Sequence, residues 1–414
     1  MTRPSPSARA EPVEAQGRSE TSPSTSSGRA GVRPLRLGFP VKVMGRNGLK
    51  TQDTRRWQKN PHLKCSLELL DHVLDYLAAE KLDMYRMSSD IAPYATHPDM
   101  PQFHSMVKDS DAELRAFGAK AKALDIRLSF HPSQYVLLNS PDPELTRKSI
   151  WDLSSQAEML DRMELNDEAV MVTHVGGVYD DKDASRARWI EGYEQCPEHV
   201  KRRLVLENDD IRFSAADALW IHERTGVRLI FDYQHMWCLN PERLDMRETL
   251  EKFVASWPEG VRPKIHFSSP RTELREVKQK ITPKQREAAK AGRGKAKKGE
   301  LLKAPVKATA RIKTVLRPPI WTGHADFTNP FEFATFMRMA DGLEFDVMME
   351  GKSKDLSLLR LRPDLLRYAP DVAARFGITD ADAAQLAADE AALERGVAAE
   401  DEADVDEGLQ LAAE

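Results

Sequence analysis

Short apolar runs recur through the middle of the chain, and most of them end at a polar residue. The runs are continuous rather than alternating, which is typical of strands buried on both faces of a parallel sheet. Eight such runs predict eight strands. They are Leu35–Phe39, Met84–Met87, Leu128–Phe130, Val170–Thr173, Leu204–Leu206, Leu229–Phe231, Lys264–Ile265 and Phe345–Met349.

Segments with helical periodicity lie between these runs. The first has four leucines on one helical face: Leu67, Leu70, Leu74 and Leu77. Residues 112–124 and 150–163 show a similar pattern. Strands that alternate with helices in this way predict an α/β fold, a TIM-type (β/α)8 barrel. A doubly wound open sheet is the alternative, which the lack of a glycine-rich phosphate loop makes less favoured.

Composition divides the chain into a barrel domain and three polar segments. Residues 1–34 hold few large apolar side chains and are predicted to be a disordered leader. Residues 377–414 carry twelve carboxylates and one Arg, and we expect an acidic disordered tail. The barrel domain, 35–376, contains a basic stretch at 271–320 with sixteen Lys and Arg against four Glu. This stretch is predicted to be a flexible insertion between the seventh and eighth strands.

The composition also bears on location. With 41% hydrophobic and 30% charged residues, the chain has no apolar run of the roughly 18 residues that a membrane span needs. Its N-terminus lacks the apolar core of a secretory signal, so export is not expected. Three scattered cysteines are too few for a disulfide framework or a cysteine zinc site. We therefore expect a cytoplasmic protein, associated with the nucleoid in a bacterium.

The predicted strands end in residues that bind metals. Strands three to eight each end at or contain a histidine or a carboxylate, and in a barrel these ends meet on one face. With two further histidines there are eight candidates: His131, His174, Glu207, Asp232, His235, His266, His324 and Glu350. Each alone is more often a hydrogen-bonded core residue, but so many buried polar groups together would be costly without cations. Imidazole and carboxylate suit Zn²⁺, Mn²⁺ or Fe²⁺, and eight ligands indicate two or three ions.

Lys264 lies two residues before His266, so both side chains face the same side of the strand. Two interpretations of it stay open: an interior ion-pair partner, or a functional group near the metals.

Several segments together resemble a known family, in the family's order and over roughly residues 35–370. They include Arg86-Met87-Ser88-Ser89, His131-Pro132-Ser133-Gln134-Tyr135, Thr173-His174-Val175-Gly176-Gly177, Leu206-Glu207-Asn208-Asp209, Phe231-Asp232-Tyr233-Gln234-His235 and Lys264-Ile265-His266. The sequence resembles the UV damage endonucleases, metal-dependent (β/α)8 enzymes related to the endonuclease IV group of abasic-site nucleases.

The resemblance implies roles for the candidate residues. The eight candidates match the family's metal ligands, with Glu207 bridging two ions, and Mn²⁺ is the expected metal, with Zn²⁺ or another divalent ion as the alternative. Glu207, Lys264 and His266 are implied as catalytic residues, and Lys264 matches a position that can carry a carboxylated lysine. Gln134 and Tyr135 match a pair that enters the duplex at the lesion.

The resemblance further implies damaged double-stranded DNA as the substrate. The strand would be cut immediately 5′ to pyrimidine dimers, 6-4 photoproducts or abasic sites, leaving a 3′-hydroxyl and a 5′-phosphate. Damaged sites would be recognised because they are easier to bend and unstack. The basic insertion would add phosphate contacts, or it is only a solvated loop.

One chain carries every candidate ligand, so a monomer suffices. Two other functions stay open: a metal-dependent sugar isomerase or epimerase on a similar barrel, and a non-catalytic lesion-binding protein.

Overall fold

The computed structural model describes residues 33–45, 48–179, 181–284 and 312–381, together with 287, 301–302 and 384. Most of the predicted disordered leader and acidic tail, and much of the basic insertion, lie outside these residues, so the predictions for them remain predictions. Within the described part of the chain, no helix is both long enough and apolar enough to cross a membrane.

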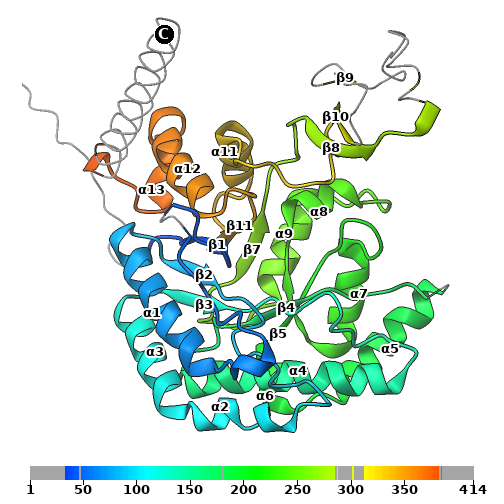
Figure 1. Ribbon diagram of the computed structural model, residues 1–414. Coiled ribbons are helices and arrows are strands. Elements are labelled where there is room, and N and C mark those ends of the chain that lie inside the picture. The colour runs from blue at the N-terminus through cyan, green and yellow to red at the C-terminus, as the bar shows by residue number, and fades with distance from the viewer. Residues whose placement is uncertain are drawn as a thin grey trace, which may run out of the picture. The chain divides into compact units, whose positions relative to one another are not determined.

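Eight parallel strands alternate with helices along the chain (Figure 1). Each strand has three or four residues, and its bounds differ from the predicted ones by at most two residues. They are β1 (Leu37–Pro40), β2 (Met84–Arg86), β3 (Arg127–Ser129), β4 (Met171–Thr173), β5 (Leu204–Glu207), β6 (Arg228–Ile230), β7 (Lys264–Phe267) and β11 (Asp346–Met349).

The eight strands close into a ring. One sheet has the order β3-β2-β1-β11-β7 and a second has the order β4-β5-β6. Two parallel bridges join the sheets, one from Phe130 to Met171 and one from Asp232 to His266. At the second bridge the amide of His266 donates to the carbonyl of Phe231 at 2.9 Å. Every strand therefore has two neighbours, which confirms the (β/α)8 barrel, because an open doubly wound sheet would leave two edge strands.

Side chains alternate along each strand between the barrel interior and the surrounding helices. Val170, Val172, Val205 and Ile230 form one buried cluster with Trp257 inside the barrel. The strand residues between them belong to the larger core that the strands share with the helices. Because successive side chains in a strand point to opposite faces, residues two positions further along point into the same interior.

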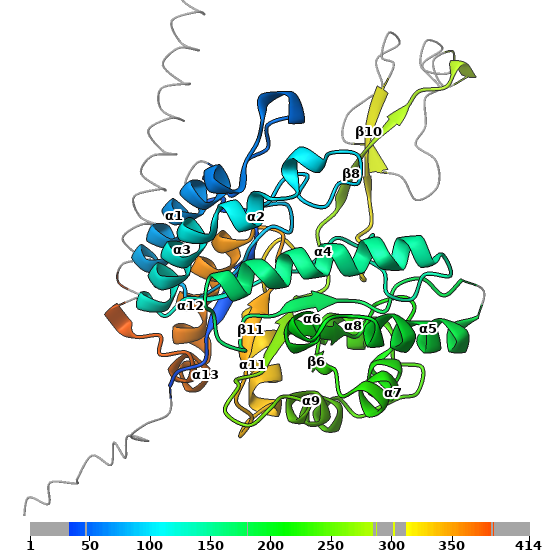
Figure 2. The ribbon, with the colours of Figure 1, turned by 90° about the horizontal axis from the view of Figure 1, so that it is seen from below.

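Helices cover the outside of the ring (Figure 2). The four leucines of the predicted first helix lie in α1 (Leu63–Ala79) and are at most 4% exposed, which confirms that helical face. Two short turns, η1 (Trp57–Lys59) and η2 (Pro101–Phe103), precede α1 and α2. The helices are α1 (Leu63–Ala79), α2 (Met106–Asp109), α3 (Asp111–Ala123), α4 (Pro143–Arg162), α5 (Lys182–Glu194), α6 (Glu198–Arg203), α7 (Ala215–Thr225), α8 (Tyr233–Cys238), α9 (Met246–Ala255), α11 (Pro330–Met339), α12 (Asp355–Tyr368) and α13 (Pro370–Arg375).

The two ends of the basic insertion pair with each other. β8 (Arg275–Lys280) runs antiparallel to β10 (Ile312–Arg317) over six residue pairs, and the short β9 (Leu301–Leu302) pairs with β10. In both views β8 and β10 extend outward from the barrel (Figures 1 and 2). The sequence analysis predicted a flexible insertion throughout; the structure instead shows a β-ribbon at its base. We call β8 and β10 the β8–β10 ribbon.

Buried ion pairs lie at the amino-terminal end of the barrel, opposite the strand ends that carry the candidate ligands. Arg127 Nη1 and Arg36 Nη1 donate to Asp346 Oδ2 at 2.9 and 3.2 Å. Arg36 also donates to Glu168 at 2.7 Å. The side chains of Asp346 and Arg127 are 0% and 1% exposed. This network joins the first residues of β3 and β11 to the residue before β1.

Candidate metal centre

The strand register points the candidate ligands into the barrel. His174, Glu207 and Asp232 each follow an interior residue of the same strand by two positions, so their side chains turn inward at the carboxyl ends of the strands. His266 follows the buried Lys264 by two positions in β7. Closure of the barrel then brings these ends together, as the sequence predicted.

Glu207, the last residue of β5, lies at the centre of the cluster. Its Oε2 is 3.3 Å from Nε2 of His131 and 3.5 Å from Nε2 of His174. Its Oε1 is 2.9 Å from Nδ1 of His266 and 3.5 Å from Nδ1 of His235. Four imidazoles from four different strand ends or loops therefore converge on one carboxylate that is 1% exposed.

Asp232 and His235 are held by the start of α8. The side chain of Asp232 caps this helix by accepting a hydrogen bond from the amide of His235 at 2.7 Å. Asn208 fixes both residues: its Oδ1 accepts from the amide of Asp232, and its carbonyl is 2.8 Å from Nδ1 of His235. The helix cap thus sets the orientation of two candidate ligands three residues apart.

Glu350 completes the ring on the other side. It follows β11, and its Oε1 is 3.6 Å from Nδ1 of His266. Arg86, at the end of β2, forms an ion pair with the same oxygen. We assigned no role to Arg86 from the sequence, because only its place in a family-like segment marked it. The ion pair orients the Glu350 carboxylate toward the centre of the barrel.

All eight predicted ligands lie around one cavity or directly beneath it. The cavity has a volume of about 280 Å³ and is lined by six of them, with Arg86, Val41 and residues 87–89. Asp232 and His266, which are 0% exposed, lie deeper and form a group with Glu207. His324 is farther out, its ring 6.2 Å from that of His235.

The donor set fits divalent cations. Two groups of three possible ligands have their ligand atoms within 4.8 Å of one another: His131, His174 and Glu207, and Glu207, Asp232 and His266. Glu207 belongs to both groups, as a bridging carboxylate requires. Among the described residues, several buried ring and carboxyl atoms of the cluster have no hydrogen-bond partner. They are His174 Nδ1, Asp232 Oδ2, His266 Nε2 and His324 Nδ1. Buried polar atoms without partners are costly, and a cation would satisfy them.

The electrostatics of the cluster also favour cations. Burial raises the pKa of Asp232 to about 8, helped by the nearby carboxylates of Glu207 and Glu350. The pKa of His235 is raised to about 10, because the charges of Asp232 and Glu207 outweigh the effect of burial. Burial lowers the pKa of His266 to about 4. The cluster therefore carries an excess of carboxylate charge that protons or metal ions must balance.

Lys264 is fully buried below the cluster. Its Nζ donates to the hydroxyl of Ser129 at 3.2 Å, and among the described residues it has no carboxylate within ion-pair distance. Burial and the charges of Arg127 and Arg86 hold the pKa of Lys264 well below its usual value. The structure thus gives no support to the interpretation of Lys264 as an interior ion-pair partner.

Gln134 and Tyr135 lie on the loop that follows His131. They line a groove of about 730 Å³ that also contains His131, His174, His235 and His324. Tyr135 is 73% exposed, so its ring is not packed into the core. The pair therefore stands beside the candidate metal centre, free to contact a bound molecule. The sequence analysis missed further residues lining the same groove: Tyr179, Ile211 and Arg212.

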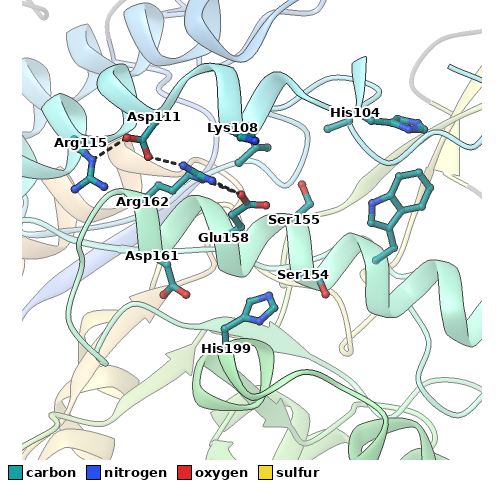
Figure 3. A pocket seen from close by; sticks show the side chains of 13 residues that line it. His104, Lys108, Asp111, Arg115, Ser154, Ser155, Glu158, Asp161, Arg162 and His199 are labelled. Atoms are coloured by element: carbon teal, nitrogen blue, oxygen red, sulfur yellow. Dashed lines mark hydrogen bonds and ion pairs between the residues drawn. The ribbon is translucent and has the colours of Figure 1, made fainter. Parts of the chain in front are cut away.

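A second hollow, of about 560 Å³, lies on the helical wall away from the candidate ligands (Figure 3). Its charged residues pair with one another: Asp111 accepts from Arg115 at 2.9 Å and from Arg162 at 2.5 Å, and Arg162 also donates to Glu158 at 2.8 Å (Figure 3). These contacts tie α3 to α4. We interpret this hollow as part of the helix packing.

Comparison with known proteins gives a consistent result. A model of the family described as UV-endonuclease UvdE matches residues 53–374. A UV DNA damage endonuclease of Bacillus cereus (strain B4264) is 30% identical over 307 residues, which cover 73% of this chain and 81% of that protein. One from Bacillus velezensis is 33% identical over 211 residues, which cover 51% of this chain and 65%, just under two thirds, of that protein.

The crystal structure of SacUVDE is similar to this structure with a TM-score of 0.60 and 27% sequence identity. The match covers 80% of this chain and 98% of that chain, so it spans almost all of the SacUVDE chain. With the family model matching most of the barrel domain, the chain belongs to the UV-endonuclease UvdE family.

Proposed function

We propose that this protein is a metal-dependent endonuclease that cuts UV-damaged double-stranded DNA. The observation that carries the proposal is the position of the Glu207-centred ligand cluster in the same groove as the exposed Gln134 and Tyr135. Related proteins named UV DNA damage endonuclease support the substrate. The finer prediction is a cut immediately 5′ to a pyrimidine dimer, a 6-4 photoproduct or an abasic site, leaving a 3′-hydroxyl and a 5′-phosphate.

The residues of the cluster would hold two or three divalent ions, with Mn²⁺ as the proposed metal. Bound ions of this kind lower the pKa of a water ligand and stabilise both the entering and the leaving oxygen of a phosphodiester. Glu207 would bridge two ions, His131 and His174 would bind on one side of it, and Asp232 and His266 on the other. Arg86 holds Glu350 in place from the edge of the cavity.

The groove gives the damaged strand a place beside these ligands. Tyr135 presents a planar ring that can replace lost base stacking, and the Gln134 amide can pair with exposed base edges. A pyrimidine dimer weakens stacking, so unstacking it costs less free energy than unstacking intact bases. Selectivity would then come from the deformability of the damaged duplex rather than from its base sequence.

Tyr135→Ala is expected to lower kcat/KM on a dimer-containing duplex by about 10- to 100-fold, since aromatic stacking on one base contributes about 1–3 kcal/mol. Tyr135→Phe keeps the ring and should stay near the wild-type rate. Nicking rates and metal content of both variants provide the measurement. Loss of activity in the Phe variant equal to that in the Ala variant would rule out the stacking role.

Lys264 is expected to carry a carboxyl group on Nζ. The amine is buried beside Arg86 and Arg127 without an acidic partner among the described residues, and its lowered pKa favours the neutral form, which is the form that can add carbon dioxide. Crystallography of protein kept at pH 8 with bicarbonate should show extra density on Nζ, and Lys264→Gln should lose activity. An unmodified amine under these conditions would contradict the expectation.

Closed-circular DNA irradiated with ultraviolet light tests the proposed function directly. With Mn²⁺, the purified protein should convert irradiated circles to nicked circles and leave unirradiated circles intact, and EDTA should stop the reaction. Binding without nicking would support a non-catalytic lesion-binding protein. If the protein neither binds nor nicks the irradiated DNA, the result would support a sugar isomerase or epimerase instead. A monomeric state and a cytoplasmic location remain predictions.

A further inference from the structure

The β8–β10 ribbon has one covered face and one open face. Val277 is partly buried, and Val315 directly opposite it is 0% exposed. On the alternate positions of β8, Lys278 and Lys280 are exposed. Successive residues of a strand point to opposite faces, so the two lysines stand together on the face away from the valines.

The open face is cationic. Directly opposite residues share a face, so Thr314 lies beside Lys278, and Ile312, which is 55% exposed, lies beside Lys280. Lys284 follows four residues further on and is also exposed. Across the described ranges, none of these three lysines forms an ion pair. Glu276, the single carboxylate of β8, is on the same face as Lys278 and Lys280, at the end of the strand that is nearer the barrel.

The base of the ribbon is fixed to the candidate metal centre. An antiparallel bridge joins Pro270 to the candidate ligand His324. On either side of it, the amide of Arg271 donates to the carbonyl of Gly323 at 2.7 Å, and that of Ala325 donates to the carbonyl of Ser269 at 2.9 Å. β7, which carries His266, leads directly into this connection. The ribbon therefore leaves the barrel at the face where the proposed ligands converge.

We propose that the open face of the β8–β10 ribbon binds the sugar-phosphate backbone of duplex DNA to one side of the lesion. Six residues of strand span about 20 Å, which is enough to reach several base pairs beyond the candidate centre. Lysines without acidic partners complement phosphates, and such contacts fix a protein on the duplex without reading its bases. The inference rests on the proposed function only in assuming that DNA enters at this face.

The test replaces Lys278, Lys280 and Lys284 together with Gln in the full chain. Binding to a duplex with one pyrimidine dimer and to the same duplex without damage is measured between about 50 and 200 mM salt. The negative slope of log K against log salt should become shallower by about 2 to 3, since each lost phosphate contact removes about 0.9 from its magnitude. Affinity at about 0.1 M salt should fall by roughly tenfold or more for both duplexes.

A matched control makes the same change of charge at the opposite end of the barrel. Lys122, Lys201 and Lys252 lie in the last turns of α3, α6 and α9, which end near the amino-terminal ends of the strands. Their replacement with Gln should leave the salt slope unchanged. A ribbon variant with the wild-type or control slope overturns the inference.

Nicking of the dimer-containing duplex at low salt and saturating protein separates this inference from the proposed function. The ribbon variant should retain the wild-type nicking rate under these conditions. If the wild-type protein nicks the duplex but the ribbon variant has the same salt slope as the wild-type protein, the ribbon inference is rejected and the proposed function stands. If the salt slopes of the two proteins differ as expected but the wild-type protein does not nick the duplex, the proposed function is rejected and the ribbon inference stands.

Discussion

Glu207→Gln is expected to reduce the nicking rate on irradiated DNA by roughly 10³-fold or more. The carboxylate contacts histidines on two sides, with its Oε1 2.9 Å from His266 and its Oε2 3.3 Å from His131. An amide of the same shape cannot bridge two cations, and metal ions contribute several kcal/mol to the stabilisation of a phosphodiester transition state. Elemental analysis should show fewer ions bound per chain than in the wild-type protein.

The control for this experiment is the same substitution at an exposed position. Glu198, in α6, is 90% exposed, and Glu198→Gln should retain both activity and metal content. Circular dichroism should show the same fold for all three proteins, because Gln fits the volume of Glu. Full activity in the Glu207 variant would remove the proposed role of the cluster.

The barrel and the positions of its ligands could be predicted from the sequence because both follow from local patterns. A buried parallel strand is a short continuous apolar run, and the residue that ends it lies at the catalytic face of the barrel. His131 and Glu207 could be placed in this way. The loop with Gln134 and Tyr135 could not be derived from periodicity and was marked by resemblance alone.

The long-range pairings could not be predicted, because no local pattern marks them. Arg86 and Glu350 are 264 residues apart and meet only when the barrel closes. The β8–β10 ribbon was also missed as a structure. β8 contains a single apolar residue, Val277, among charged and polar ones, so its composition indicated a loop. In the structure every second residue of β8 is exposed, as in a strand with one open face. β8 and its partner β10 are also separated by a long basic segment, so nothing in the local sequence indicates that they pair.

Asp346→Ala is expected to destabilise the fold by about 3–5 kcal/mol, the usual cost of removing one partner of a buried ion pair. The carboxylate accepts from Arg127 at 2.9 Å and from the backbone amide of Arg36 at 2.9 Å, and its side chain is 0% exposed. Its removal leaves the buried Arg127 guanidinium without its nearest counter-charge. Calorimetry should show a decrease in Tm of about 5–10 °C.

The matched control breaks an exposed ion pair of the same chemistry. Asp371 pairs with Arg338 at 2.7 Å, and both side chains are more than half exposed. Asp371→Ala should cost at most about 1 kcal/mol, because water screens exposed pairs and replaces their hydrogen bonds. The double variant Asp346→Leu with Arg127→Met should recover part of the lost stability, since it leaves no unpaired charge at that position. An equal loss of stability in the Asp346 and Asp371 variants would show that the buried charges at the amino-terminal end of the barrel do not stabilise the fold more than an exposed ion pair does.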